Sequence, residues 1–169
     1  MIATMRDFFD PITPAHVDWS GQVPTSAVFD DGYFGHDNAP SEAQAVFIEG
    51  NRLAQRFDTL QTDEVFVIGE TGFGTGLNVL LAASLFEQRA HPGARLEIVS
   101  VDLHPLQAQD LARAVALWPS LGVWSQRLLM QYPAAAPGHH RVVLSDHISL
   151  TLIWGDATTA FEATTARVD

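Results

Sequence analysis

The feature that most constrains this chain is a glycine-rich segment placed between two apolar segments. Residues 65–68 form a short β-branched and aromatic run, which is typical of a strand buried on both faces. Residues 77–86 are apolar over a longer stretch and rich in leucine and alanine, which predicts a helix. Gly72, Gly74 and Gly76 lie between them. This order predicts the first βα unit of a doubly wound α/β sheet, where ligands bind at the carboxyl ends of the strands.

The spacing of these glycines excludes two phosphate-binding motifs. A P-loop needs a lysine after its last glycine, and all nine basic residues of the chain are arginine. A dinucleotide fingerprint needs a further glycine where Leu77 or Val79 stands. Instead Glu70 precedes the three alternate glycines, and its carboxylate can accept hydrogen bonds from the ammonium group of an amino-acid cofactor. The pattern is that of S-adenosylmethionine-dependent methyltransferases; a turn that only lets helix and sheet pack is the alternative.

Two further acids follow predicted strands. Asp102 ends the strand predicted over residues 96–102, where it can accept hydrogen bonds from both ribose hydroxyls of an adenosine cofactor. The alternative is an acid that complements the dipole of the next helix. Asp156 follows the strand predicted over residues 148–154, and it can contact the adenine amino group or cap the helix expected at 157–163. We expect both acids at the sheet edge that carries the glycines.

Residues 1–58 are predicted to form an N-terminal extension that contains a β-hairpin and a helix. The hairpin joins residues 17–19 to 22–23. A capping-box pattern, Ser41 with Gln44, predicts the start of the helix. Its predicted apolar face comprises Val46, Phe47, Gly50, Leu53, Ala54 and Phe57.

Asp31 and Tyr33 lie in an acidic and aromatic loop between the hairpin and the helix. Either they reach into the cleft and line it, or they belong to a turn held by aromatic anchors.

Residues 59–169 are predicted to form the first part of the main domain. Beyond the second strand, residues 106–117 and 120–130 predict helices, and residues 141–144 predict a strand that forms a hairpin with the last one. His139 and His140 have no acidic partner at ligand spacing, so we expect no metal site.

Composition limits the class of function. A length of 169 residues and an apolar fraction of 47% fit one globular domain. The absence of cysteine excludes disulfides, thiolate metal sites and a cysteine nucleophile. A net charge of −11 argues against tight binding of nucleic acid by this segment alone, because such binding relies on clustered basic residues. With neither a signal peptide nor an apolar run of spanning length, we expect a cytoplasmic protein.

The sequence resembles the methyltransferase domain of the bacterial bifunctional tRNA-modification enzymes of the MnmC family, from about Val17 to its last residue. The glycine-rich block is the most specific part, because Phe73, Leu77 and Asn78 go beyond the general methyltransferase pattern. The residues that carry the resemblance are Phe29, Asp30, Asp31, Tyr33, Phe34, Asn38, Glu42, Val46, Phe47, Gly50, Asn51, residues 66–78, Gly155 and Asp156.

The resemblance implies a Rossmann-like class I S-adenosylmethionine-dependent methyltransferase fold. It also implies methyl transfer to the 5-aminomethyl group of a wobble uridine in tRNA, giving 5-methylaminomethyl-2-thiouridine. In most members an FAD-dependent oxidase domain follows. Asp102 would take the ribose, Asp156 the adenine side, and Asp31 and Tyr33 would line the cleft. The whole set of implied cofactor-binding residues is Glu70, Gly72, Phe73, Gly74, Thr75, Gly76, Asn78, Asp102 and Asp156.

The resemblance also implies an incomplete fold. In the family, the position of Val168 and Asp169 opens a fourth strand, whose end carries an acidic segment beside the transferred methyl group. We therefore expect the 169-residue chain alone to be marginally stable and inactive, and we assign no catalytic residue within it. A non-catalytic S-adenosylmethionine-binding or interaction module remains an alternative, as does a nicotinamide-dependent oxidoreductase.

Overall fold

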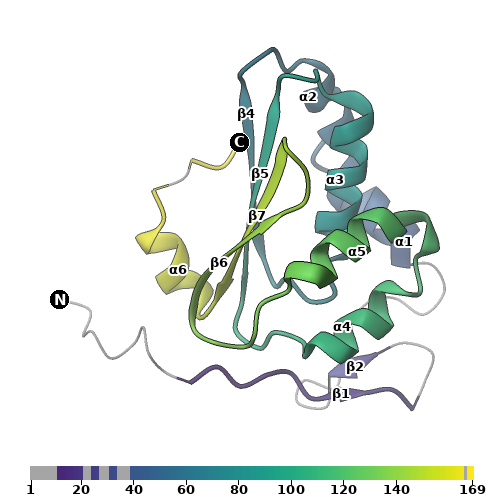
Figure 1. The fold of residues 1–169 in the computed structure, drawn as a ribbon, viewed down its shortest axis with the longest axis vertical. Coiled ribbons are helices and arrows are strands. Elements are labelled where there is room, and N and C mark those ends of the chain that lie inside the picture. The colour runs from purple at the N-terminus through teal and green to yellow at the C-terminus, as the bar shows by residue number, and fades with distance from the viewer. Residues whose placement is uncertain (1–10, 21–23, 27–30, 34–38, 166) are drawn as a thin grey trace.

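A four-stranded mixed sheet forms the centre of the molecule. The structure, a computed structural model, describes residues 11–20, 24–26, 31–33, 39–165 and 167–169. Strands β4 (Val65–Thr71), β5 (Arg95–Asp102) and β7 (Ile148–Trp154) run parallel, and β6 (Gly138–Val143) pairs antiparallel with β7. The order across the sheet is β4-β5-β7-β6 (Figure 1). The three predicted parallel strands and the closing hairpin are confirmed.

Helices cover both faces of this sheet, as the doubly wound plan requires. Figure 1 shows α3 (Leu77–Arg89) and α5 (Gly122–Gln131) on one side and α6 (Ala157–Ala163) on the other. The larger hydrophobic core lies beneath α3 and α5, and a smaller core of Val99, Val101, Ile153 and Ala160 lies beneath α6. Two shorter elements, α4 (Ala108–Val115) and the 3-10 turn η2 (Pro119–Leu121), precede α5. The α/β class predicted from the βα pattern is confirmed.

The helix predicted from Ser41 is broken into three pieces, which the sequence pattern did not predict. Helix α1 (Ala39–Ala43) already includes Ser41, so the predicted N-cap is wrong. A π-helix, η1 (Gln44–Glu49), follows, and α2 (Leu53–Asp58) begins only after Arg52 adopts a left-handed conformation with φ of 53°.

Gly50 explains how the π-helical turn is tolerated. Its backbone N–H donates to the carbonyl oxygen of Ala45, five residues earlier, at 3.0 Å. A side chain at this position would overlap the Val46 carbonyl, so only glycine fits. The extra residue in the turn also rotates the buried face. Val46, predicted to be buried, is 69% exposed, whereas Ile48 is 2% exposed.

A small antiparallel sheet precedes α1 in the described part of the chain. Strand β1 (Val17–Asp18) pairs with β2 (Thr25–Ser26), which pairs with β3 (Asp31–Gly32). The strand partner predicted at residues 22–23 lies outside the described residues. Trp19 fastens this sheet to α4, because its Nε1 donates to Asp110 Oδ1 at 2.9 Å and its ring lies 4.2 Å from the Arg113 guanidinium carbon. Figure 1 shows β1 and β2 beside α4.

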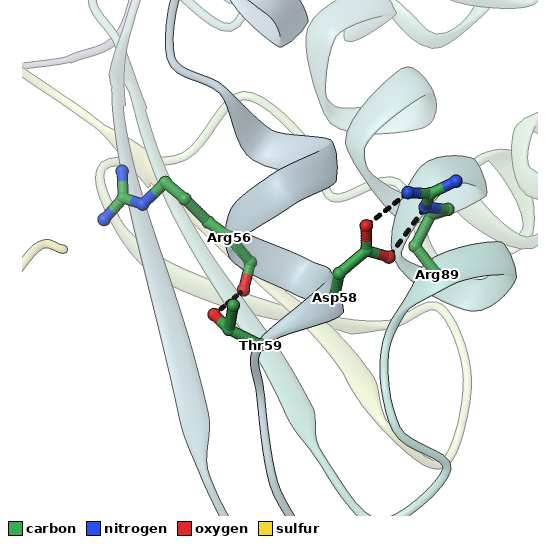
Figure 2. Close-up of polar contacts among 4 residues, drawn as sticks. All are labelled: Arg56, Asp58, Thr59 and Arg89. Carbon is green, nitrogen blue, oxygen red and sulfur yellow. Dashed lines mark hydrogen bonds and ion pairs between the residues drawn. The ribbon is translucent and has the colours of Figure 1, made fainter.

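The contact between α2 and α3 combines a surface ion pair with a buried aromatic cluster. Figure 2 shows the Arg89 guanidinium donating two hydrogen bonds to the Asp58 carboxylate, and Thr59 Oγ1 donating to the Arg56 carbonyl. Both partners of the ion pair are partly exposed, so it contributes little to stability. Beneath it, Phe57 is fully buried and packs edge-on against Phe66 and Phe86. The distances between ring centroids are 5.2 and 5.1 Å.

Replacement of Phe57 by alanine should therefore destabilise the protein strongly. Loss of a fully buried aromatic ring, with the cavity it leaves, costs about 3–5 kcal/mol. Urea denaturation followed by circular dichroism measures the change, and Val46→Ala serves as the exposed control on the preceding turn, with an expected effect below about 0.5 kcal/mol. Equal effects of the two substitutions would contradict this account of the core.

Candidate functional site

The glycine turn between β4 and α3 opens onto the carboxyl edge of the sheet. Its first backbone amide, that of Gly72, donates to the Val101 carbonyl at 2.7 Å and so ties the turn to β5. All three glycines have positive φ, but their surroundings differ. A Cβ on Gly76 would lie 2.7 Å from the Phe73 ring, whereas a Cβ on Gly72 would meet no atom within 4 Å. Gly76 is therefore required by packing, and Gly72 keeps space open in front of the sheet.

Two clefts meet at this turn, and both are lined by Gly32, Tyr33 and Gly72. The smaller, of about 490 Å³, lies at the carboxyl ends of β5 and β7. The larger, of about 650 Å³, lies over the glycine turn and against α1 and η1. The remaining lining residues of the smaller cleft are Ser26, Val101, Asp102, Leu103, His104, Gly155, Asp156 and Ala157. Those of the larger cleft are Ala39, Glu42, Ala43, Val46, Phe47, Phe73, Gly74, Thr75, Leu77 and Asn78.

Asp102 joins the turn to the end of β5. Its Oδ2 accepts a hydrogen bond from the backbone N–H of Gly74 at 2.9 Å, and its Oδ1 accepts from that of His104 at 2.8 Å. The carboxylate is thus fixed in the wall of the smaller cleft, and each oxygen retains capacity for a second donor. The next helix, α4, begins at Ala108 with Gln107 as its N-cap, so Asp102 does not serve as the helix-terminal acid that the alternative proposed.

Glu70 lies behind the wall of the larger cleft. Its side chain is 7% exposed; Oε1 accepts from Asn78 Nδ2 at 3.0 Å and Oε2 accepts from Ser100 Oγ at 2.6 Å. Burial raises the pKa of Glu70 to about 7; the Ser100 and Asn78 hydrogen bonds oppose the rise, and the Asp102 charge adds to it. Asn78, which is half-buried, is the member of this group that lines the cleft.

Tyr33 lies where the two clefts join. Burial raises the pKa of its hydroxyl to about 12, with smaller contributions from the charges of Asp102 and Asp110, so it stays neutral at physiological pH. Asp31, its predicted companion, belongs to β3, but its side chain lies outside the described residues.

Phe73 lines the larger cleft but is almost fully buried. The ring is 3% exposed and stacks on Tyr132, with centroids 6.1 Å apart, and it also meets the edge of Trp154. Thr75 is likewise buried, at 4% exposure. These two members of the predicted cofactor-binding set therefore shape the turn from within.

Asp156 caps helix α6. Its Oδ1 accepts from the backbone N–H of Thr159 at 2.9 Å and from the Thr159 hydroxyl at 3.2 Å, and the backbone hydrogen bond is the main cause of its lowered pKa. The capping alternative is observed, and the side chain also lines the smaller cleft. Its contact with adenine stays a prediction.

Ser100 is the residue of this site that the sequence reasoning missed. It is fully buried on β5 among Ile98, Val99 and Val101. A hydroxyl within the apolar run of residues 98–101 was the available signal, because a buried polar group needs a partner.

Among the described residues, no three acidic or histidine side chains are grouped so that they could hold a metal ion. No helix in the same part of the chain is long and apolar enough to cross a membrane.

Comparison with known proteins finds relatives in both structure and sequence. The crystal structure of MnmC2 from Aquifex aeolicus superimposes with a TM-score of 0.62 and 17% sequence identity, covering 97% of this chain and 50% of that one. Fold and cleft together define a doubly wound, Rossmann-like α/β protein with its site at the carboxyl edge of the sheet. No protein-family model matches the chain.

Proteins of more similar sequence are MnmC proteins from bacteria. The chain is 52% identical over 157 residues to the tRNA 5-methylaminomethyl-2-thiouridine biosynthesis bifunctional protein MnmC of Pseudomonas fluorescens (strain Pf-5). It is 42% identical over 161 residues to the protein of the same name from Legionella pneumophila (strain Corby). These matches cover 92% and 94% of this chain but only 24% of each relative. The chain is thus a relative of the MnmC proteins, and it spans about a quarter of their length.

Replacement of Glu70 by glutamine should stabilise the protein, and the gain should depend on pH. In the unfolded chain Glu70 titrates near its ordinary pKa of 4.5, whereas in the folded protein it titrates at about 7. Between these values the folded protein holds a proton that the unfolded chain has released, so the stability of the wild type falls as pH rises. Above pH 7 the cost of the buried charge is complete, on the order of 1–3 kcal/mol.

Thermal melts of the wild type and of Glu70→Gln between pH 4.5 and 8 test this. The advantage of the variant should be smallest at pH 4.5 and reach a plateau above pH 7. A constant difference across the range would contradict the assignment of the raised pKa to Glu70.

Proposed function

We propose that this chain contributes the S-adenosylmethionine-binding part of an enzyme that methylates the 5-aminomethyl group of a wobble uridine in tRNA. The observation that carries the proposal is the open space before Gly72, at the junction of two clefts and beside a carboxylate fixed at the end of β5. The relation to MnmC proteins supports the tRNA substrate.

The residues present fit an amino-acid nucleoside cofactor. Asp102 would accept hydrogen bonds from the ribose hydroxyls, and Leu103 and Asp156 lie in the same cleft, where they would flank the adenine. The methionine end would extend over Gly72 and Gly74 into the larger cleft. A cationic amino-acid end suits this position because the Glu70 carboxylate lies behind its wall.

The bound cofactor supplies a methyl group already activated by its sulfonium sulfur. What remains for the chain is positioning and the exclusion of water. Tyr33, neutral and half-buried at the junction of the clefts, would orient the cofactor there. Asp31 is proposed to lie on the same side of the cleft, on the strand that precedes Tyr33. The group that removes a proton from the accepting amine is not assigned within this chain.

The whole protein would need more than this segment. We propose that a basic surface elsewhere holds the tRNA, because this chain carries twenty acids and nine arginines. We also propose that the whole protein carries an FAD-dependent oxidase domain and is cytoplasmic. Within this chain, we propose an extension (1–58) followed by the first part of the methyltransferase domain (59–169).

Calorimetric titration with S-adenosylhomocysteine tests the cofactor assignment. Gly74→Arg should abolish saturable binding, because Gly74 lines the larger cleft and has φ of +53°. A Cβ at this position would lie 3.6 Å from the Tyr33 ring, so the longer arginine side chain would enter the cleft. Gly122→Arg is the matched control: it adds the same side chain at the start of α5, where a Cβ meets no atom within 4 Å. Binding should survive in the control.

The folded state of each variant is verified by circular dichroism. Absence of binding by the folded wild type would overturn the cofactor assignment. Unchanged binding by Gly74→Arg would place the cofactor elsewhere.

A further inference from the structure

Ser100 lies directly opposite Glu70 in the parallel pairing of β4 with β5. Its hydroxyl is fully buried and donates to Glu70 Oε2 at 2.6 Å, a short distance typical of a hydrogen bond to a charged acceptor. On the other side of the carboxylate, Asn78 Nδ2 donates to Oε1. The three side chains form a chain of hydrogen bonds that runs from the middle of the sheet to the cleft.

The direction of these hydrogen bonds determines what the cleft offers a ligand. Both partners donate, which matches an ionised carboxylate, since that group can only accept. Because the amide nitrogen of Asn78 is bound to Glu70, its carbonyl oxygen Oδ1 is left as the acceptor. Among the described residues, no other side chain or backbone group is bonded to Oδ1. An acceptor in the wall of the larger cleft suits an ammonium group.

We propose that Ser100 is a positioning residue for the cofactor's amino-acid end: it fixes the Glu70 carboxylate, which in turn orients Asn78 toward the ammonium group. This rests on the proposed function, since it names how the same site would recognise its cofactor. Ser100 itself does not line either cleft, so its effect on binding passes through Glu70.

The electrostatics around Glu70 make the proposal measurable. Loss of the Ser100 hydroxyl removes the larger of the two hydrogen bonds that oppose the effect of burial on this carboxyl. Among the described residues, the charge of Asp102 on β5 also affects Glu70, and like burial it raises the pKa of that carboxyl. Ser100→Ala should therefore require a higher pH to ionise Glu70.

Titrations of the purified protein between pH 5.5 and 8.5 test this with two probes. S-adenosylhomocysteine carries the ammonium group, and 5′-methylthioadenosine lacks the whole amino-acid part. In the wild type, affinity for S-adenosylhomocysteine should rise with pH as Glu70 ionises. In Ser100→Ala the midpoint of that rise should move up by about one pH unit, with about fivefold weaker binding at pH 7, where the ionised fraction of Glu70 falls from about one half to about one tenth. Binding of 5′-methylthioadenosine should change less than about twofold.

Three further variants keep the result specific. Ser125→Ala removes a different buried serine hydroxyl, bonded to the Leu121 carbonyl, and should leave both titrations unchanged. Glu70→Gln should bind S-adenosylhomocysteine weakly and lose the pH-dependent rise, and Ser100→Ala should have no further effect in that background. Ser100→Cys, nearly isosteric and a poorer donor, replaces Ser100→Ala if the latter folds poorly.

Failure of the Ser100 role and failure of the proposed function give different results. If Ser100→Ala behaves like Ser125→Ala, or weakens both probes equally at every pH, the positioning role is overturned while the cofactor site stands. If the folded wild type binds neither probe, the proposed function fails, and this role fails with it.

Discussion

The register between β4 and β5 is the constraint on which the site depends. Parallel pairing places Glu70 opposite Ser100 and Thr71 opposite Val101, and the Gly72 amide continues the ladder by donating to the Val101 carbonyl. A slip of one residue would move every side chain to the other face of the sheet. Glu70 would then lose both of its donors. Strand β5 holds this register from both cores, but β4 buries only alternate side chains, such as Phe66 and Ile68, in the larger core, and its Val65 is exposed. The prediction that residues 65–68 are buried on both faces is therefore wrong, because β4 lies at the edge of the described sheet.

A carboxylate adds polar contacts to the apolar packing that holds the glycine turn. Asp102 bonds to the amides of Gly74 and His104, so one carboxylate joins the turn after β4 to the turn after β5. Replacement of the Asp102 carboxylate by an apolar group would destabilise the turn as well as the cleft wall, because the two amide donors would lose their acceptor. Asp102 therefore both stabilises the turn and lines the smaller cleft, and Asp156 likewise caps α6 and lines that cleft.

Much of this arrangement could be predicted from the sequence because local pattern and tertiary context agree there. The apolar run, the alternate glycines and the following Leu-rich segment determine β4, the turn and α3, and acids after strands must meet at one sheet edge. The segment around Val46 could not be predicted in this way. Periodicity assumes an unbroken α-helix, and the π-helical turn at η1 rotates the buried face by the width of one residue. Ser100 was missed because its role depends on its partner in a neighbouring strand.

The acidic side chains around the two clefts bear on which ligand the clefts would favour. Asp156 has a lowered pKa and so presents negative charge to the smaller cleft at neutral pH, and the Asp102 carboxylate lines the same cleft. Glu70, buried, titrates close to neutrality and gains from a cation placed before it. An anionic phosphate would be repelled by all three. A nucleoside with hydroxyl donors at one end and an ammonium group at the other would be attracted at both ends, and this difference supports the proposed cofactor over nucleic acid as a ligand of these clefts.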